Sequence, residues 1–376
     1  MKILFLGDAS NMHNCLAGEL RRQGHHCVVA SNGSRWMDTA RDVDLTRRPG
    51  LLGATAYLAR VAWLSLTAWR GFDVVVLCGH HFLELKPAKL RLIADRLKRH
   101  NRRVILSALG TDIVYWRACH DGHTFRYSDY RLGDRPSPYV DSGEYRAQHQ
   151  DNWQRTDMAA YGDHIVSIID GAIASLYEYY AAYRPVLGSR ATYGGIPVDT
   201  AALQPVPRGD EPPQKVRLFI GIQRDRTVIK GTDRLLEAAR RLHDRHPEQV
   251  ELDVVENLPY NDYVQRMRHS HVLLDQLYSY TPATNALIAM AQGIATVSGG
   301  EPEYYDLLGE RDLRPIINVD PTVEGDLDAR LEWLVSPDGR AALPRLWRES
   351  RTLVERHNSA AIVAHRWLDF LTAPCF

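Results

Sequence analysis

The sequence predicts an α/β protein with two domains, each containing a parallel β-sheet. Short apolar and β-branched runs alternate with stretches of helical periodicity along almost the whole chain, which is typical of parallel sheets covered by helices. A segment rich in proline and charge, near residues 197–214, interrupts this alternation, which then starts again. The length of 376 residues also exceeds what one hydrophobic core normally serves.

The first half contains the clearest strand signals. Its expected strands are the runs KILFLG, CVVAS, FDVVVLCG and RVILSALG. Expected helices include NCLAGELRRQG, which ends at Gly24, and LRLIADRLKRH, and the segments HIVSIIDGAIAS and RATYGGIPVDT close this half. A polar, aromatic-rich insertion over about residues 115–161 breaks the rhythm, and a long irregular segment of this kind is usually functional or mobile.

The second half repeats the same alternation. Its expected strands are VRLFIGI, VELDVVE, HVLLDQL, ATVSG and PIINVD. Helices are expected from Asp233 to His243, from Asp262 onward, and over the apolar stretch that precedes ATVSG. In parallel sheets ligands bind at the carboxyl ends of the strands, so the polar residues that follow these runs are the candidates for a site.

Charge and cysteine content narrow the class of protein. Lys+Arg and Asp+Glu each number 46, so no global field favours nucleic acid, and any partner is recognised locally. KILFLG is too short for the apolar core of a signal peptide, so no export is implied. The cysteines have no paired spacing, which fits a reducing cytoplasm. They are Cys15, Cys27, Cys78, Cys119 and Cys375.

The stretch from Leu51 to Gly71 has about the length of a membrane span. Arg60 lies near its middle, where a charge is costly in a bilayer, so we interpret the stretch as an amphipathic or buried helix. The alternative is a helix on the membrane surface, with Trp63 and Trp69 as anchors, because interfacial helices combine aromatic and basic residues. That alternative would add a peripheral membrane contact, at the inner face of the membrane, to a cytoplasmic protein.

A buried helix is expected between Thr281 and Gly293. Thr281 is a favoured N-cap, Pro282 suits the first helical position and Gly293 suits the C-terminal end. The apolar run at 286–291 leaves no polar face, so protein should surround this helix on all sides.

Only the first turn of this helix is available to a ligand. Its residues are Thr281, Ala283, Thr284 and Asn285. Free N–H groups and the positive end of the helix dipole favour an anion there, most naturally a phosphate. A helix capped by Thr281 for stability alone is the alternative.

A basic loop in the same half strengthens the phosphate interpretation. Arg224, Arg226 and Lys230 follow a predicted strand and precede a predicted helix, so they should project toward a ligand at the edge of the sheet. Two or three cations together with a helix N-terminus suit a diphosphate, because charge-assisted hydrogen bonds are stronger than neutral ones. The alternative is a solvated charged loop.

Three segments resemble the retaining GT-B glycosyltransferases of the large family four. FIGIQRDRTVIKGTDRLLEAARRL is similar to the family's segment in which a basic residue and then Lys-Gly precede a helix. GGIPVDTAALQP resembles its interdomain Asn-Gly-Val-Asp turn. IAMAQGIATVSGGEPE resembles its Glu-Ala-Met-Ala-x-Gly element, followed by a strand and Gly-Gly-x-x-Glu. The resemblance runs over most of the chain and is densest in the second half.

This resemblance implies a GT-B fold, with two Rossmann-like domains facing across a cleft. Residues 1–198 would form the acceptor side, residues 199–355 would bind the nucleotide sugar, and residues 356–376 would form a helix that crosses back to the N-terminal domain. The implied reaction moves a sugar from a UDP- or GDP-sugar to a glycan, lipid-linked or other hydroxyl acceptor, with retention of configuration. The resemblance implies no catalytic metal and no cofactor besides the donor.

The sequence departs from the family at two glutamates. Tyr280 and Ile288 occupy their positions, and Ile288 cannot accept the hydrogen bonds of the donor ribose as the second glutamate normally does. Tyr280, Glu301 and Glu303 are the candidates to replace that acceptor. Its loss would cost about 1–3 kcal/mol. The diphosphate part of the site would remain, because it depends on backbone N–H groups and cations.

The roles predicted for individual residues follow from the charge that develops on the leaving group. Negative charge builds on the nucleoside diphosphate while the sugar becomes oxocarbenium-like, so fixed cations should assist departure. Lys230 is the leading candidate, and Arg224 and Arg226 share second place. Asp112, in GTD after a first-half strand, orients donor or acceptor hydroxyl groups or is a plain turn residue. The segment from Glu256 to Tyr260 is expected to border the base.

Other protein classes fit less well. GDASNMH is not the GxGxxG fingerprint of a dinucleotide enzyme, and the histidines of CGHH and CHDGH lack the paired spacing of a structural zinc site. Two alternatives stay open: a degenerate relative that binds a nucleotide or glycan as a scaffold, and a GT-B epimerase acting on a nucleotide sugar.

The aromatic residues of the insertion either stack on sugar rings or pack in a core. They are Tyr127, Tyr130, Tyr139, Tyr145 and Trp153.

Overall fold

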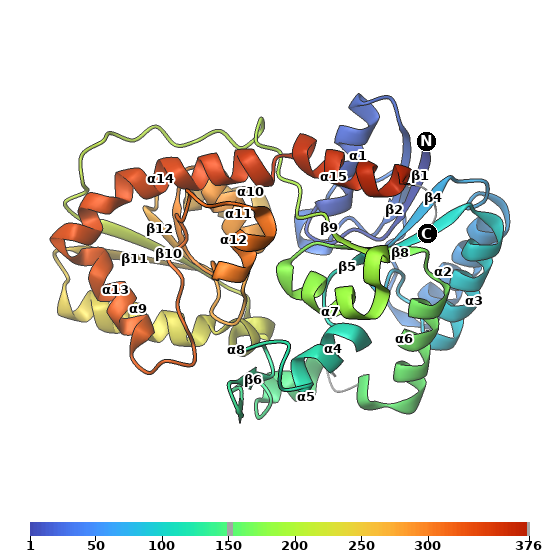
Figure 1. Cartoon of the computed structure of the whole chain (residues 1–376), viewed down its shortest axis with the longest axis horizontal. Helices are drawn as coiled ribbons and strands as arrows, with labels where there is room; N and C mark the ends of the chain where they lie inside the picture. The colour runs from blue at the N-terminus through green and yellow to red at the C-terminus, as the bar shows by residue number, and fades with distance from the viewer. Residues whose placement is uncertain (149–152, 374–376) are drawn as a thin grey trace. The chain divides into compact units, whose positions relative to one another are not determined.

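The structure, a computed structural model, divides the chain into two units, each with its own parallel sheet (Figure 1). It describes residues 1–148 and 153–373, apart from the side chains of Arg35 and Gln148. Unit 1 comprises Met1–Arg117, Gln150–Pro197 and Ala360–Phe376, and unit 2 comprises Ala118–His149 and Val198–Ser359.

Unit 1 is built on seven parallel strands in the order β3-β2-β1-β4-β5-β8-β9. Phe5 lies between Val29 and Val76 in the register, and the three side chains are fully buried. The chain adds strands on one side of β1 and then returns to add β4 on the other, so the topological switch point lies between β1 and β4. The strands are β1 Lys2–Leu6, β2 His26–Ser31, β3 Val43–Asp44, β4 Val74–Cys78, β5 Arg103–Ala108, β8 Gly171–Ala174 and β9 Ala191–Tyr193.

The helices of unit 1 begin and end largely where local signals place them. α1 stops just before Gly24, which adopts the left-handed conformation that favours glycine. α3 has Pro87 at its first position and three basic residues in its last turn, which suit the helix dipole. These helices are α1 Met12–Arg22, α2 Gly50–Thr67, α3 Pro87–His100, α4 Ile113–His120 (its last three residues in unit 2), α6 Thr156–Ile168, α7 Tyr177–Leu187 and α15 Ala360–Thr372.

The last helix, α15, belongs to unit 1 although it follows unit 2 in the sequence. Val363, Ala364 and Trp367 are buried in one core with residues of β1 and α1, and Figure 1 shows α15 (red) beside α1 (blue). Arg103 at the start of β5 also donates a hydrogen bond to the Leu371 carbonyl at 3.0 Å. The expected return of a C-terminal helix to the first unit is therefore confirmed.

Unit 2 contains four parallel strands in the order β11-β10-β12-β13. They are β10 Val216–Ile222, β11 Val250–Glu256, β12 Val272–Leu274 and β13 Ala295–Val297. The expected strand PIINVD contributes only a single bridge, between Ile317 and Val297. The main helices around this sheet are α9 Thr232–Arg245, α10 Tyr260–Met267, α11 Thr284–Ala291, α12 Pro302–Leu308, α13 Asp326–Val335 and α14 Pro337–His357.

The buried helix α11 begins two residues later than predicted. Thr281 is not its N-cap; Ala283 is. The Thr281 carbonyl accepts a hydrogen bond from the Ser279 hydroxyl at 2.8 Å, so it is engaged in a turn rather than in the helix. The other two expectations are confirmed, because residues 286–291 are all buried and Gly293 follows the helix with a φ of 69°.

Residues 118–148 form the clearest departure from the predicted domain limits, which placed them in the first domain. The structure groups them with unit 2. They contain a short hairpin, β6 Arg131–Leu132 with β7 Arg135–Pro136, and the helix α5 Gly143–Gln148. Side chains of this segment bond to residues of unit 2, as described below, and these bonds explain the grouping.

Two further sequence expectations concern cysteines and membrane spans. The described cysteines, Cys15, Cys27, Cys78 and Cys119, are not disulfide-bonded, and Cys375 lies outside the described residues. Among the residues that the structure describes, no helix has the length and apolar character needed to cross a membrane.

Candidate functional site

The candidate site lies at the carboxyl edge of the unit 2 sheet. Parallel strands end at the same edge, so the residues that follow β10, β12 and β13 are brought together. Asp275 follows β12 directly and Ser298 follows β13 directly, while the loop after β10 leads to Lys230 through a short helix, α8 Thr227–Lys230.

Asp275 is the centre of a hydrogen-bond network at this edge. Its side chain is buried, and its residue is only 3% exposed. Oδ1 accepts a hydrogen bond from the Asn285 amide at 2.9 Å, and Oδ2 accepts one from the Ser298 hydroxyl at 3.1 Å. The Tyr263 hydroxyl donates to Asn285 Oδ1 at 2.9 Å, and burial raises the pKa of Tyr263, which keeps this donor protonated. Asn285 is therefore held on both sides.

The hydrogen bonds of this network fix the position of the first turn of α11. Asn285 lies in that turn, and its fixed amide anchors the start of the helix to β12. Within the described residues, the N–H groups of Thr284, Asn285 and Ala286 have no hydrogen-bond acceptor. These residues, together with Ala283, are where the phosphate was predicted, and the structure leaves their donors available.

Lys230 lies close to the same network. Burial lowers the pKa of its ammonium group, and attraction to the Asp275 carboxylate opposes that effect. In the part of the chain that the structure describes, no hydrogen bond or ion pair engages the Lys230 side chain. Gly231 is required after it, because its φ is 70° and a Cβ there would meet the Leu277 side chain at 3.0 Å. The Lys-Gly pair thus combines an unpaired cation with a tight turn.

The two predicted arginines differ from Lys230. Arg224 forms an exposed ion pair with Glu256, with 2.7 Å between Nη2 and Oε2, so two residues predicted to touch different parts of a nucleotide contact each other. Arg226 is exposed, and its charge contributes to the lowered pKa of Lys230, which places it near that group. Tyr260 begins helix α10 beyond the end of β11.

The three candidates to replace the missing glutamate are engaged by the segment 118–148. Glu301 Oε2 accepts from Arg126 Nη2 at 2.6 Å, and Glu303 Oε1 lies 3.1 Å from the same nitrogen. The Tyr280 hydroxyl accepts from the Arg126 backbone N–H at 2.7 Å, and burial raises the pKa of Tyr280 to about 12. Tyr127 stacks on Tyr280 with 4.7 Å between ring centroids.

Glu144 makes a second contact of this segment with unit 2. Its carboxylate accepts the backbone N–H groups of Val228 at 2.9 Å and Ile229 at 3.0 Å. A negative group therefore already lies in the basic loop, within two residues of Lys230. Neither Glu144 nor Arg126 carried a sequence signal, because both contacts join residues far apart in the chain.

Asp112 belongs to unit 1 and is fully engaged there. Oδ1 accepts the N–H groups of Val114 and Tyr115, each at 2.9 Å, which caps the start of α4. Oδ2 accepts from the Tyr183 hydroxyl at 2.7 Å, and His80 Nδ1 lies 3.4 Å away. These contacts give Asp112 a structural role at the start of α4, and its predicted role toward donor or acceptor hydroxyl groups stays a prediction.

The aromatic residues of the insertion pack mostly in a core. Tyr127, Tyr130, Tyr139 and Trp153 are buried, whereas Tyr145 is partly exposed. The histidines nearby also contact aromatic rings, as His80 does with Trp153. Among the described residues, no three histidine, cysteine or acidic side chains are grouped as metal ligands.

Asp275 is the main residue that the sequence interpretation missed. The signal was present, since an acidic residue directly follows the fully buried strand β12 and a charge at that position must be paired or hydrogen-bonded. Unit 2 has a cavity of about 260 Å³, and neither Lys230 nor Asp275 lines it.

Comparison with known proteins identifies the fold. Sucrose-phosphate synthase from Thermosynechococcus elongatus matches with a TM-score of 0.62 and 12% identity, over 98% of both chains. A UDP complex of MnaA from S. aureus matches at 0.54 and 11% identity, over 98% of this chain and 95% of the other. UDP-GlcNAc 2-epimerase from Neisseria meningitidis, bound to UDP-GlcNAc, matches at 0.52 and 12% identity, over 99% of both chains.

These neighbours have the GT-B fold, and the two Rossmann-like units of the present chain have the same fold. No protein-family model matches the sequence, and comparison with curated protein sequences finds no relative.

Proposed function

We propose that this protein transfers a glycosyl group from a nucleoside-diphosphate sugar to a hydroxyl acceptor, with unit 2 binding the donor. One observation carries the proposal: the Lys230 side chain, which has no hydrogen bond or ion pair within the described residues, is near enough to Asp275 to be attracted by its charge, and Asp275 also holds the open first turn of α11. A cation and unpartnered N–H groups at one sheet edge suit a diphosphate. The structural neighbours include a UDP complex and a UDP-GlcNAc complex, which supports the same class of ligand.

The chemistry assigned to these residues is stabilisation of the leaving group. Lys230 and the α11 N–H groups would balance the charge that develops on the diphosphate as the sugar leaves. Arg226 would add a second charge from the loop, and Arg224 would join by leaving its exposed pair with Glu256, which is a weak interaction. Retention of configuration is part of the proposal because of the motif resemblance.

Donor turnover tests the proposal. The protein is incubated with UDP- and GDP-sugars, and nucleotide release is measured. Lys230→Ala should lower the rate about 100- to 1000-fold, since removal of one preorganised donor to a developing charge has that effect. Lys215→Ala is the matched control, because Lys215 is exposed beside the start of β10, at the opposite edge of the sheet. Equal rates in the two variants would refute the assignment of Lys230.

An epimerase is the second candidate, because UDP-GlcNAc 2-epimerases match this chain over nearly their whole length. Epimerisation at C2 would exchange the proton on that carbon with solvent, whereas glycosyl transfer leaves it in place. Incubation of the donor in D₂O, followed by proton NMR of the sugar, separates the two reactions.

A nucleotide-binding scaffold is the third candidate. Tyr280 and Glu301 are already engaged by Arg126 and Tyr127, and the family's two glutamates are absent. Stabilisation of the protein by nucleotide, with no turnover of any donor, would favour this function.

The proposal also covers the acceptor and the location of the protein in the cell. We propose a glycan or lipid-linked acceptor and a cytoplasmic protein in contact with the inner face of the membrane. Trp63 is 61% exposed on α2 and suits such a contact, whereas Trp69 is 2% exposed and cannot serve as the second anchor predicted for it. Vesicle co-sedimentation of the full chain measures the contact.

A further inference from the structure

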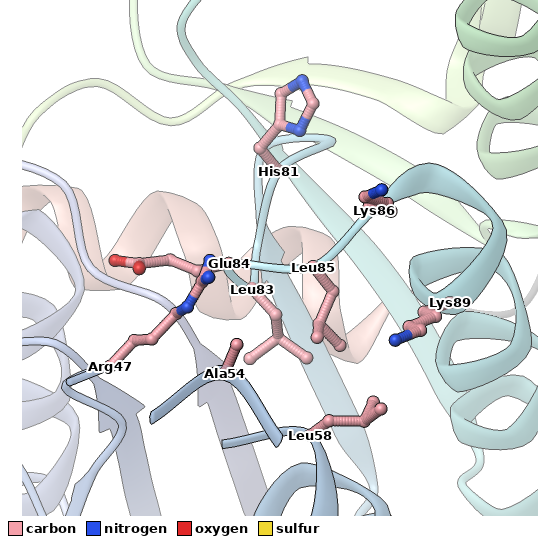
Figure 2. Close-up of a pocket in the computed structure, with 9 residues that line it drawn as sticks. All are labelled: Arg47, Ala54, Leu58, His81, Leu83, Glu84, Leu85, Lys86 and Lys89. Carbon is pink, nitrogen blue, oxygen red and sulfur yellow. The ribbon is translucent and has the colours of Figure 1, made fainter. Parts of the chain in front are cut away.

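Unit 1 contains a cavity of about 540 Å³ that the donor chemistry does not use (Figure 2). It lies beyond the carboxyl end of β4, beside the switch point between β1 and β4 where ligands of such sheets bind. Its volume is in the range of small-molecule sites. The lining residues are Arg47, Ala54, Leu58, His81, Leu83, Glu84, Leu85, Lys86 and Lys89.

Three cations and one carboxylate, that of Glu84, belong to the residues that line this cavity, so its lining carries a net positive charge. Arg47 and Lys89 extend toward the cavity from opposite sides, and Lys86 is the residue before the first position of α3 (Figure 2). Within residues 1–148 and 153–373, none of these three cations has a hydrogen bond or ion pair through its side chain. The Glu84 carboxylate is turned away and accepts from the Asn32 amide at 2.9 Å. The cavity therefore offers cations without their counter-charges.

The apolar lining restricts the type of anion. Ala54, Leu58, Leu83 and Leu85 form the rest of the wall. Cations around an apolar surface suit a molecule with an anionic group attached to a hydrocarbon part. A free inorganic anion would leave this surface without a partner, and a neutral glycan would find few hydrogen-bond acceptors, because the one carboxylate points away.

Helix α2 extends the apolar surface to the outside of unit 1. Ala54 and Leu58 of this helix line the cavity. Another face of the helix carries apolar residues that recur at intervals of four and three, and all of them are exposed. They are Leu52, Ala56, Ala59, Trp63 and Leu66. Leu52 is 87% exposed and Leu66 is 51% exposed. A contiguous exposed apolar face of this kind marks a binding surface.

The charges around α2 indicate which surface it fits. Arg47 and Arg48 precede the helix, Arg60 lies within it, and all three are exposed. Tryptophan and leucine on one face with arginines at the side are the composition of a helix that lies in the interface of an anionic membrane. A protein partner would require no such excess of one charge.

We propose that this cavity binds the phosphate group of a lipid-anchored acceptor, while the exposed face of α2 lies in the bilayer that holds its hydrocarbon chain. The inference rests on the proposed glycosyl transfer, because it names the class of acceptor. Arg47, Lys86 and Lys89 bind the phosphate, and Leu58, Leu83 and Leu85 contact the first carbons of the chain.

Vesicle binding of the full-length protein tests this inference without any turnover. The probe is phosphatidylcholine vesicles that contain hexadecyl phosphate, compared with the same vesicles containing hexadecanol or phosphatidylserine. Hexadecyl phosphate should give the tightest binding. Arg47→Gln and Lys89→Gln should each weaken it about fivefold, the effect of roughly 1 kcal/mol per basic residue. Trp63→Ser should weaken it roughly tenfold through lost apolar contact.

Matched controls come from the same unit. Arg99→Gln removes an exposed charge at the far end of α3, and Val186→Ser removes an exposed apolar side chain of α7. Both should bind like the unchanged protein. Thermal unfolding of every variant, read by circular dichroism, shows whether loss of binding reflects loss of folding. A variant that is folded but weak in binding supports the inference.

Three results would overturn it. Equal binding to phosphatidylserine and hexadecyl phosphate, unaffected by the cavity variants, would show general surface electrostatics. Competition by inorganic phosphate as strong as that by hexadecyl phosphate would show a site for a free anion. Dimerisation that Trp63→Ser abolishes, without vesicle binding, would assign α2 to a protein interface. Donor turnover is measured separately, so its absence alongside intact lipid binding would count against glycosyl transfer and not against the cavity.

Discussion

The carboxyl edges of the two sheets differ in how many of their polar side chains bond to other groups of the protein. In unit 2, Asp275, Asn285 and Ser298 bond to one another and are buried or half-buried. Around the cavity of unit 1, the side chains of Arg47 and Lys89 have no hydrogen bond or ion pair within the described residues. Groups that bond internally stabilise the fold and fix geometry, whereas unpaired charges at the surface contribute little stability and are free to bind a ligand.

The largest effect on stability should come from Asp275→Ala. The change leaves the Asn285 amide and the Ser298 hydroxyl without their acceptor and removes the charge that opposes the lowered pKa of Lys230, so we expect a loss of about 1–3 kcal/mol in the free energy of unfolding. Urea denaturation of the variant and of Asp306→Ala, an exposed aspartate in α12, measures it. Equal stabilities would mean that the network does not support unit 2.

Arg126→Ala should have the next largest effect. It removes the bond to the buried Glu301 and the contact with Glu303, and because the arginine is half-exposed we expect about 1–2 kcal/mol. Arg345→Ala, which breaks an exposed pair with Glu349 within α14, is the control and should change stability by less than about 0.5 kcal/mol. If the two variants are alike in urea, segment 118–148 is not anchored by this arginine.

Acid should destabilise unit 2 through His271. The backbone N–H of Arg217 donates to His271 Nδ1 at 3.1 Å. Burial, helped by the side-chain charges of Arg217 and Arg208, lowers the pKa of His271 to about 3. The pKa is depressed in the folded state, so this stability is present above about pH 6.5 and is lost as the pH falls toward 3, because the unfolded chain binds the proton first.

The test of this effect is the urea midpoint measured from neutral pH down through the acid range. The amide oxygen in His271→Asn accepts a hydrogen bond and does not titrate, so the variant should lose part of the pH dependence. An unchanged slope would assign the acid sensitivity to other groups.

The smallest effect should come from Lys89→Ala. Its ammonium has no bond to lose within the described residues, so the free energy of unfolding should change by less than about 0.5 kcal/mol. The change in the free energy of unfolding can be compared directly with that of Asp275→Ala, because Lys89 and Asp275 each lie at the carboxyl edge of a sheet. A loss above about 1 kcal/mol would mean that the unit 1 cations are structural and would remove the contrast between the two edges.

Much of the fold was predictable because its signals are local. Apolar runs predicted most strands of both sheets, and glycines such as Gly24 and Gly293 marked the ends of helices. Thr281 shows the limit of such signals. It has the residue type of an N-cap, but its carbonyl bonds to the side chain of Ser279 and the helix starts later.

The candidate site was predictable only in part. Lys230 and the first turn of α11 follow from loop and helix signals, whereas Asp275 acquires its role from Asn285 and Ser298, which follow other elements of the sheet. Arg224 and Glu256 were assigned separate roles, and only their proximity in space shows that they form a pair.

The sequence by itself determined most of the strands and helices, that α11 is buried on all sides, and that Lys230 and Gly231 stand together after a strand. Tertiary structure decided that residues 118–148 join unit 2 and that the apolar helix α2 leaves Leu52 and Trp63 exposed. The physical reason is that periodicity, caps and turns are properties of neighbouring residues. Side-chain pairing and burial depend on which distant elements the sheet order brings together.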